Sequence, residues 1–187
     1  MYFFDVFLFF LPKKYVECLV RQALKNLAME KHNWSIYIII TMKTPPPGVY
    51  GKNSIGIEQL FRSVLEDVGD GSAGAAVFFV GLVKRQGRGS KDSVGLYMES
   101  YEEHANKALK RICEEVREEY GLRFVGVWHF LGSFGLGEAV VVAAAAGAGR
   151  DETFAGLRKA VERYKREPAL FKKEVYVDGT EAWLEGA

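Results

Sequence analysis

The sequence predicts a mixed α/β (α+β) fold in which helices pack against a sheet. Apolar residues recur with a helical period in some segments, and apolar runs of strand length alternate with these segments. The 187 residues are 49% hydrophobic and 26% charged, which is sufficient for a sizeable core and is not typical of a disordered chain. The alternating pattern does not indicate a repeat protein.

The N-terminal part of the chain differs from the rest. Residues 1–12 are apolar, but they are too few to span a bilayer and lack the basic start and cleavage site of a secretory signal. Residues 13–31 have the pattern of an amphipathic helix, and residues 36–40 form a short strand-like run.

Three consecutive prolines precede Gly48, and such a run is typical of a linker. We therefore expect an N-terminal extension over residues 1–47, with a helix and a short strand, and a separate domain over residues 48–187.

The second part of the chain opens with a helix and two strands. An apolar stripe over residues 57–68 predicts a helix, which the glycine-rich residues 69–71 would end. Residues 75–83 and 94–100 are strand-like, and the basic segment 84–91 connects them. This segment is read as a solvated loop. Contact with RNA is the alternative, which the lack of interleaved aromatic residues disfavours.

Two helices and three strands are predicted next. Residues 102–120 carry one apolar face, begin with acidic residues and precede a glycine, as a helix would. Residues 124–130 and 139–146 predict strands. A helix follows from Asp151, its expected N-cap, and a short strand near residues 175–177 precedes an aromatic tail.

Composition excludes several classes of function. The formal charge of +1 gives no reason to expect nucleic acid or an anionic membrane as partner. Cys18 and Cys113 lie on apolar helix stripes, which indicates buried thiols in a reducing, cytoplasmic environment. The three histidines have no ligands at metal-binding spacing, so neither a metal nor a cofactor is expected. His129, inside an apolar strand, is more typical of a buried core residue than of a catalytic base.

Two lysines flank a proline near the end of the last predicted helix. Pro168 lies between Lys165 and Lys172, and a proline both lacks the backbone N–H and clashes with the preceding turn. The helix must therefore end, and the bend lets both lysines face one pocket. Neighbouring cations repel each other's protons, which is one way to make a lysine nucleophilic. A solvated basic helix end is the alternative.

A glycine-rich corner precedes that helix. In residues 147–150 (GAGR), a dinucleotide fingerprint would need a third glycine at the position of Glu152, so that motif is not indicated. Free N–H groups at a helix N-terminus beside Arg150 favour a phosphate, and a plain tight turn is the alternative.

Several motifs, in order and spacing, make residues 74–183 resemble the MoaE family, the large, catalytic subunit of molybdopterin synthase. FVGLVK at residues 79–84 resembles the family's F-x-G-x-V-R strand end, and MESY at residues 98–101 resembles its L-E-x-Y strand. HFLGSFGLGE at residues 129–138 is close to H-R-I-G-x-L-x-x-G-(D/E). The remaining matches are the helix leading to Lys165, KKE at residues 172–174 and WLE at residues 183–185.

The resemblance implies a largely antiparallel, α/β-hammerhead-like sheet and a sulfurtransferase of molybdenum cofactor biosynthesis. The family converts a cyclic pyranopterin monophosphate, precursor Z, to molybdopterin by installing two sulfurs as a dithiolene. The sulfur arrives as a thiocarboxylate on the C-terminal Gly-Gly tail of a small ubiquitin-like partner, MoaD. The catalytic subunits form a homodimer with one carrier at each end, a heterotetramer, and pocket residues come from both catalytic subunits.

By position, the resemblance assigns catalytic roles to Lys165, near the inserted tail, and to Lys172. It assigns substrate binding to Lys84, Gly149, Arg150, Lys173 and Glu174.

Some of these positions depart from the family pattern. Gly149 stands in place of a histidine, Lys84 in place of an arginine, and Pro168 is one position early. Because of these departures, the alternative is a non-catalytic relative that still binds the carrier tail.

Overall fold

The computed structural model describes residues 43–87 and 91–184. The chain divides after Ile40, and all described residues belong to the second unit, Thr41–Ala187. The helix and strand expected before residue 41, and Cys18, lie outside the described residues.

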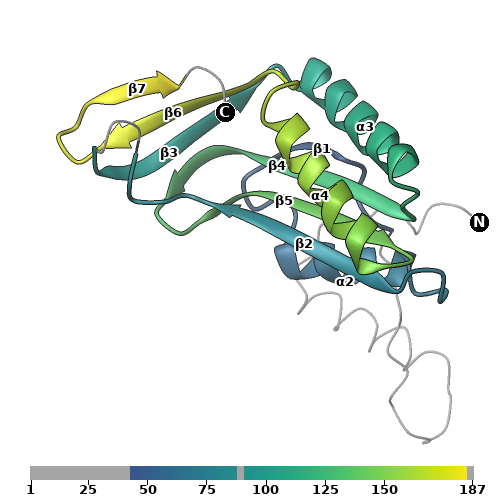
Figure 1. The fold of residues 1–187 in the computed structure, drawn as a ribbon. Helices are drawn as coiled ribbons and strands as arrows, with labels where there is room; N and C mark the ends of the chain where they lie inside the picture. Colours follow the sequence, from purple (N-terminus) through teal and green to yellow (C-terminus); the bar gives the residue numbers. More distant parts are fainter. Residues whose placement is uncertain (1–42, 88–90, 185–187) are drawn as a thin grey trace, which may run out of the picture. The chain divides into compact units, whose positions relative to one another are not determined.

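The described residues form helices on a seven-stranded sheet (Figure 1). The elements are β1 (Gly48–Gly51), α2 (Ile57–Asp67), β2 (Ala75–Leu82), β3 (Ser93–Ser100), α3 (Glu102–Glu119), β4 (Phe124–Gly135), β5 (Ala139–Gly147), α4 (Arg150–Tyr164), β6 (Leu170–Tyr176) and β7 (Glu181–Leu184). The strand order is β2-β5-β4-β3-β6-β7 with antiparallel neighbours, and β1 pairs in parallel with β4. The predicted fold class, a mixed and largely antiparallel sheet with packed helices, is therefore confirmed.

Helices cover both faces of the sheet, with α3 and α4 on one face and α2 on the other (Figure 1). Successive residues of a strand point to opposite faces, so Val141 and Val142 in β5 belong to different cores. The core under α3 and α4 includes Leu109, Ile112, Val127, Val141 and Leu157. The core under α2 includes Leu60, Val64, Trp128, Phe130 and Val142. None of the helices in the described part of the chain has the length and apolar character needed to cross a bilayer.

β4 changes partner along its length. Residues 124–129 pair with β5, whereas residues 132–135 pair with β3. Gly132 lies at this change with a φ of 122°, a conformation that residues with a Cβ atom rarely adopt. From there β3, β6 and β7 diverge from β2 and β5 as a second leaf of the sheet (Figure 1). The predicted strand at residues 124–130 was thus too short.

The start of α4 differs from the prediction. The helix begins at Arg150 with Gly149 as N-cap, so the expected cap at Asp151 is wrong. The carboxylate of Glu152, on the first turn, accepts a hydrogen bond from the Gly149 N–H at 2.5 Å. A glutamate three residues after the cap can satisfy a backbone donor in this way, even where the cap itself has no side chain.

Three strands were missed or shortened in the prediction. β1 has only four residues and two of them are glycines, so it carries almost no strand pattern. β6 begins at Leu170, not near residue 175, because its charged residues 172–174 hide the alternation. β7 occupies the predicted aromatic tail and pairs with β6.

The prolines before β1 are bound to the elements that follow them in the same unit. The buried Trp128 donates its indole N–H to the carbonyl of Pro45 at 2.8 Å, and the Tyr50 hydroxyl donates to the carbonyl of Pro46 at 2.7 Å. These two carbonyls are bound to the domain that follows them. The predicted boundary after residue 47 stays a prediction.

Candidate active site

A cavity of about 520 Å³ lies where the two leaves of the sheet diverge. It is lined by the end of β2, by residues of β3, β5 and β6, and by the C-terminal end of α4. This volume is within the range typical of small-molecule sites.

Three lysines line the cavity. Lys165 is the C-cap of α4, Lys172 lies in β6, and Lys84 follows the end of β2. Lys84 and Lys165 make no ion pair with any residue in the described ranges, so they can pair with an anionic guest. The bend around Pro168 does bring Lys165 and Lys172 to one cavity, as the position of the proline predicts.

The alternation of β6 separates two neighbouring lysines. Lys172 and Glu174 both line the cavity, whereas Lys173 does not. Lys173 instead pairs with Glu181 at 2.5 Å, and its ammonium lies 5.6 Å from the ring centroid of Trp183. Its predicted role in substrate binding stays a prediction, although within this chain its contacts are on the other face of the strand.

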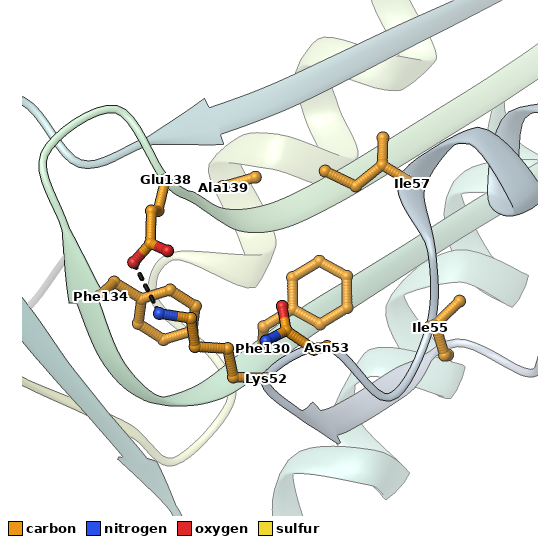
Figure 2. Close-up of a pocket in the computed structure, with 8 residues that line it drawn as sticks. All are labelled: Lys52, Asn53, Ile55, Ile57, Phe130, Phe134, Glu138 and Ala139. Carbon is orange, nitrogen blue, oxygen red and sulfur yellow. Dashed lines mark hydrogen bonds and ion pairs between the residues drawn. The ribbon is translucent and has the colours of Figure 1, made fainter. Parts of the chain in front are cut away.

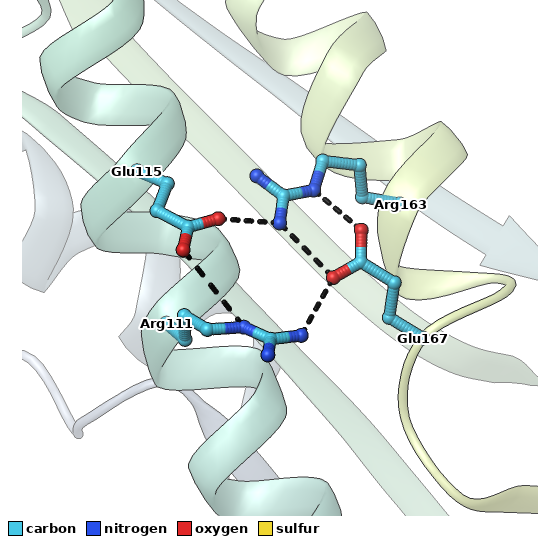
Figure 3. Close-up of polar contacts among 4 residues, drawn as sticks. All are labelled: Arg111, Glu115, Arg163 and Glu167. Atoms are coloured by element: carbon cyan, nitrogen blue, oxygen red, sulfur yellow. Dashed lines mark hydrogen bonds and ion pairs between the residues drawn. The ribbon is translucent and has the colours of Figure 1, made fainter.

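An ion-pair cluster fixes the turn that carries Lys165 (Figure 3). Glu167, two residues after Lys165, accepts hydrogen bonds from Arg163 at 2.5 and 3.0 Å and from Arg111 of α3 at 2.8 Å. Glu115 of α3 also accepts from Arg163, at 2.5 Å. The contacts with Arg163 lower the pKa of Glu167 below its usual range. The cluster therefore ties the end of α4 to α3. The sequence pattern gives no signal of this cluster, because Arg111 and Glu167 are 56 residues apart in the chain.

His129 and Tyr164 form a buried wall of the cavity. His129 is 4% exposed, and burial lowers its pKa to about 4, with a smaller contribution from the charge of Lys172. Its ring meets that of Tyr164 edge-on, with centroids 6.0 Å apart. A neutral imidazole at neutral pH agrees with the prediction of a buried core histidine, although this one also lines the cavity.

The structure does not bring the glycine-rich corner to this cavity within one chain. Neither Gly149 nor Arg150 lines it. The Arg150 side chain is 83% exposed and lies 3.5 Å from Asp151. The Gly149 N–H is already occupied by Glu152, so the predicted anion site at this helix N-terminus is partly filled by the chain's own carboxylate.

A second, smaller cavity of about 160 Å³ lies between the residues after β1 and the turn that follows β4 (Figure 2). Lys52 points into it, pairs with Glu138 at 2.6 Å and lies 5.0 Å from the Phe134 ring centroid. Because the pair neutralises itself and the space is smaller than most ligand sites, this cavity is the weaker candidate.

Cys113, metal binding and the basic segment 84–91 are the remaining features that the sequence analysis considered. Cys113 is buried, and burial raises its pKa to about 12, as expected for an unreactive core thiol. No group of three or more histidine, cysteine, aspartate or glutamate side chains in the described ranges could hold a metal ion. The basic segment 84–91 is described only in part, and the Gly87 N–H donates to the Lys91 carbonyl across it at 2.9 Å.

Comparison with known proteins identifies the family. The family model described as MoaE protein matches residues 52–167. Molybdopterin synthase catalytic subunits of Culex quinquefasciatus and Bacillus subtilis are 36% and 32% identical over 109 and 123 residues, respectively. These matches cover 58% and 66% of this chain, and 69% and 77% of the two relatives. The rat catalytic subunit is 30% identical over 59% of this chain, but the match spans only 54% of that protein.

Solved structures agree. Molybdopterin synthase from Staphylococcus aureus aligns with a TM-score of 0.65 and 25% identity over 74% of this chain and 96% of that one. A MoaE protein from Burkholderia ambifaria shares the fold, with a TM-score of 0.60 and 21% identity over 75% of this chain and 89% of that one. This chain belongs to the MoaE protein family.

Proposed function

We propose that this chain is the catalytic subunit of a molybdopterin synthase, a sulfurtransferase that acts on precursor Z in the cytoplasm. The observation that carries the proposal is the meeting of Lys84, Lys165 and Lys172 at one cavity in a chain of the MoaE family. The catalytic domain is residues 48–187, preceded by the extension over residues 1–47.

The charge of the cavity is complementary to the charge of the two reactants. Precursor Z carries a phosphate and the carrier tail ends in a thiocarboxylate, so both bring negative charge to a site lined by three lysines and one glutamate. The thiocarboxylate sulfur bonds to a carbon of the pterin side chain, and the carbon–oxygen bond at that carbon breaks, so that the oxygen leaves with a proton and the oxidation level of the carbon does not change. Water then attacks the tail carbonyl carbon, the bond from that carbon to sulfur breaks, and the tail is left as a carboxylate.

Lys165 and Lys172 assist this transfer. Lys165 contacts the carbonyl of the inserted tail and stabilises the negative charge that develops on its oxygen. Lys172 stabilises charge or donates a proton at the pterin side chain. Lys84 and Glu174, which line the cavity, bind substrate. The resemblance assigns the same role to Lys173, which does not line the cavity of its own chain.

A second copy of the chain completes the site. Arg150 and Gly149 are outside the cavity of their own chain, and the exposed Arg150 side chain is available to a neighbour. We propose that they reach the cavity of the other protomer in a homodimer. A small ubiquitin-like MoaD-type carrier binds each catalytic subunit, which gives a heterotetramer without metal or cofactor.

Lys165→Ala tests the proposal. The purified chain is incubated with precursor Z and thiocarboxylated carrier, and molybdopterin is measured as the product. We expect the variant to keep its melting temperature and to lose product formation by at least about a hundredfold. Lys110→Ala, an exposed lysine on α3, is the control and should match the wild type. Full yield from Lys165→Ala would rule out the assigned role.

The competing function is carrier binding without catalysis. Gly149 in place of histidine and Lys84 in place of arginine favour it, because a lysine cannot make the two parallel hydrogen bonds of an arginine. The same assay separates the two functions: wild-type chain that binds the carrier but forms no molybdopterin, with every component present, is the non-catalytic relative.

A further inference from the structure

Tyr164 is a buried polar residue at the cavity that neither the sequence motifs nor the proposed mechanism uses. It is the last residue of α4, directly before Lys165, and only 5% of it is exposed. It lines the same cavity as Lys165 and Lys172.

The Tyr164 hydroxyl has no hydrogen-bond partner among residues 43–87 and 91–184. Among these residues, the side-chain oxygens that are both unpaired and sealed from solvent belong to Thr44 and Ser100. The Tyr164 oxygen is not one of them, so it reaches open space, and the space that this residue lines is the cavity. By contrast, the hydroxyl of the equally buried Tyr176 donates to Glu174 at 3.0 Å.

The direction of the Tyr164 ring is fixed by its packing. It belongs to the core under α3 and α4 and meets the His129 ring edge-on. Burial raises the pKa of Tyr164 to about 12, so the hydroxyl stays protonated at neutral pH and can donate a hydrogen bond. Because its oxygen is not sealed, the hydroxyl can donate to a molecule that fills the cavity.

The charge of the cavity indicates what kind of molecule would accept this hydrogen bond. The lysines bring positive charge to the same space, so the occupant is an anion and presents oxygen acceptors. An ammonium group can be approached by an anion from many sides. The hydroxyl of a rigidly packed phenol donates in a limited direction, so it also fixes how the anion is oriented.

We propose that the Tyr164 hydroxyl donates a hydrogen bond to an anionic oxygen of the molecule bound in this cavity, and that Tyr164 is thus a further substrate-contacting residue. The inference rests on the proposed function. The anionic oxygen belongs either to the phosphate of precursor Z or to the carboxylate end of the carrier tail, and the two arms of the experiment distinguish these sources.

Tyr164→Phe removes the hydroxyl and keeps the ring. Wild-type and variant chains are titrated calorimetrically with precursor Z alone, and separately with carrier whose tail ends in a plain carboxylate, so that no turnover occurs. We expect the dissociation constant to rise at least about tenfold in one arm, which identifies the source of the oxygen. The melting temperature should not fall. Tyr120→Phe is the control, because Tyr120 is the C-cap of α3 and does not line the cavity. It should bind both ligands like the wild type.

Unchanged dissociation constants in both arms overturn the inference. Its failure is distinguishable from that of the proposed function, which is judged by product formation from the wild-type chain. Wild-type chain that binds precursor Z but forms no product overturns the function alone. Wild-type chain that binds neither ligand overturns both.

Discussion

Arg163 and Glu167 are joined by two hydrogen bonds, at 2.5 and 3.0 Å, across the end of α4. Between them in the chain lies Lys165, and Pro168 follows directly. The bend that brings Lys165 and Lys172 to one cavity therefore depends on more than the proline, since the ion-pair cluster fixes the direction in which the chain leaves the helix (Figure 3).

Glu167→Gln should destabilise the domain by about 1 kcal/mol at pH 7, because it removes charge-assisted hydrogen bonds that are partly open to solvent. The folded-state pKa of Glu167 is depressed, so its contribution is present above the unfolded-state pKa and is lost as the pH falls through the folded-state value. The difference between wild type and variant should thus shrink on acidification. Urea unfolding at pH 7 and at pH 3 measures it.

The control for this substitution is Glu119→Gln. Glu119 is exposed at the end of α3 and makes no ion pair within the described part of the chain. It should change the free energy of unfolding very little at either pH. An effect of Glu167→Gln no larger than that of the control would contradict the structural role of the cluster.

His129 should make the domain sensitive to mild acid. Burial depresses its folded-state pKa to about 4, so the unfolded chain binds a proton first as the pH falls below about 6.5. The contribution of His129 to the free energy of unfolding is fully present above that pH. It decreases by about 2 kcal/mol between pH 7 and pH 4.5. His129→Leu should lack this component. Urea unfolding of both proteins across that pH range provides the comparison, and identical pH dependence would show that the histidine is not buried in its neutral form.

Lys172→Ala and Lys173→Ala should have different effects, although the two residues are neighbours. Lys172 lines the cavity, so its loss should reduce kcat for molybdopterin formation at least about a hundredfold. Lys173 pairs with Glu181 on the other face, so its loss should loosen β7 and leave kcat within about threefold of wild type. Steady-state kinetics of the two variants decide between this placement and the substrate-binding role that the resemblance assigns to Lys173. A large rise in KM with Lys173→Ala would support that role.

Arg150 should act in the cavity of the other protomer. Arg150→Ala and Lys165→Ala chains are each inactive alone, but a mixed dimer contains one cavity with both substitutions and one with neither. Random mixing should therefore restore about a quarter of wild-type activity, since half of the dimers are mixed and half of their cavities are intact. Mixing the unfolded chains, refolding them and measuring molybdopterin formation tests this.

The mixture gives a clear negative result if Arg150 acts within its own chain. Each cavity of the mixed dimer would then carry one substitution, and activity would stay at the level of the separate variants. Native mass spectrometry of the refolded mixture, which separates mixed dimers from the two homodimers by mass, provides the reference for exchange between protomers.

Elements whose apolar residues repeat with a clear period could be predicted without the structure. The apolar face of α3 and the strand pattern of β2 can be recognised within a short segment of sequence. This is because the side of a helix or strand that faces the core carries apolar residues at regular intervals. Pro168 likewise predicts where α4 must end, because its effect on the backbone needs no distant partner. The order and spacing of the motifs were sufficient to identify the family.

Features that depend on contacts between distant residues could not be predicted in this way. The change of partner of β4 at Gly132 separates the two leaves of the sheet at the cavity, and the contact of Arg111 with Glu167 fixes the turn that carries Lys165. Neither feature produces a periodic pattern in the sequence. The exposure of Arg150 has the same origin, as does the lack of a partner for the Tyr164 hydroxyl among the described residues. Whether a polar group is paired, buried or open to a cavity depends on what packs around it, and only the folded chain sets those neighbours.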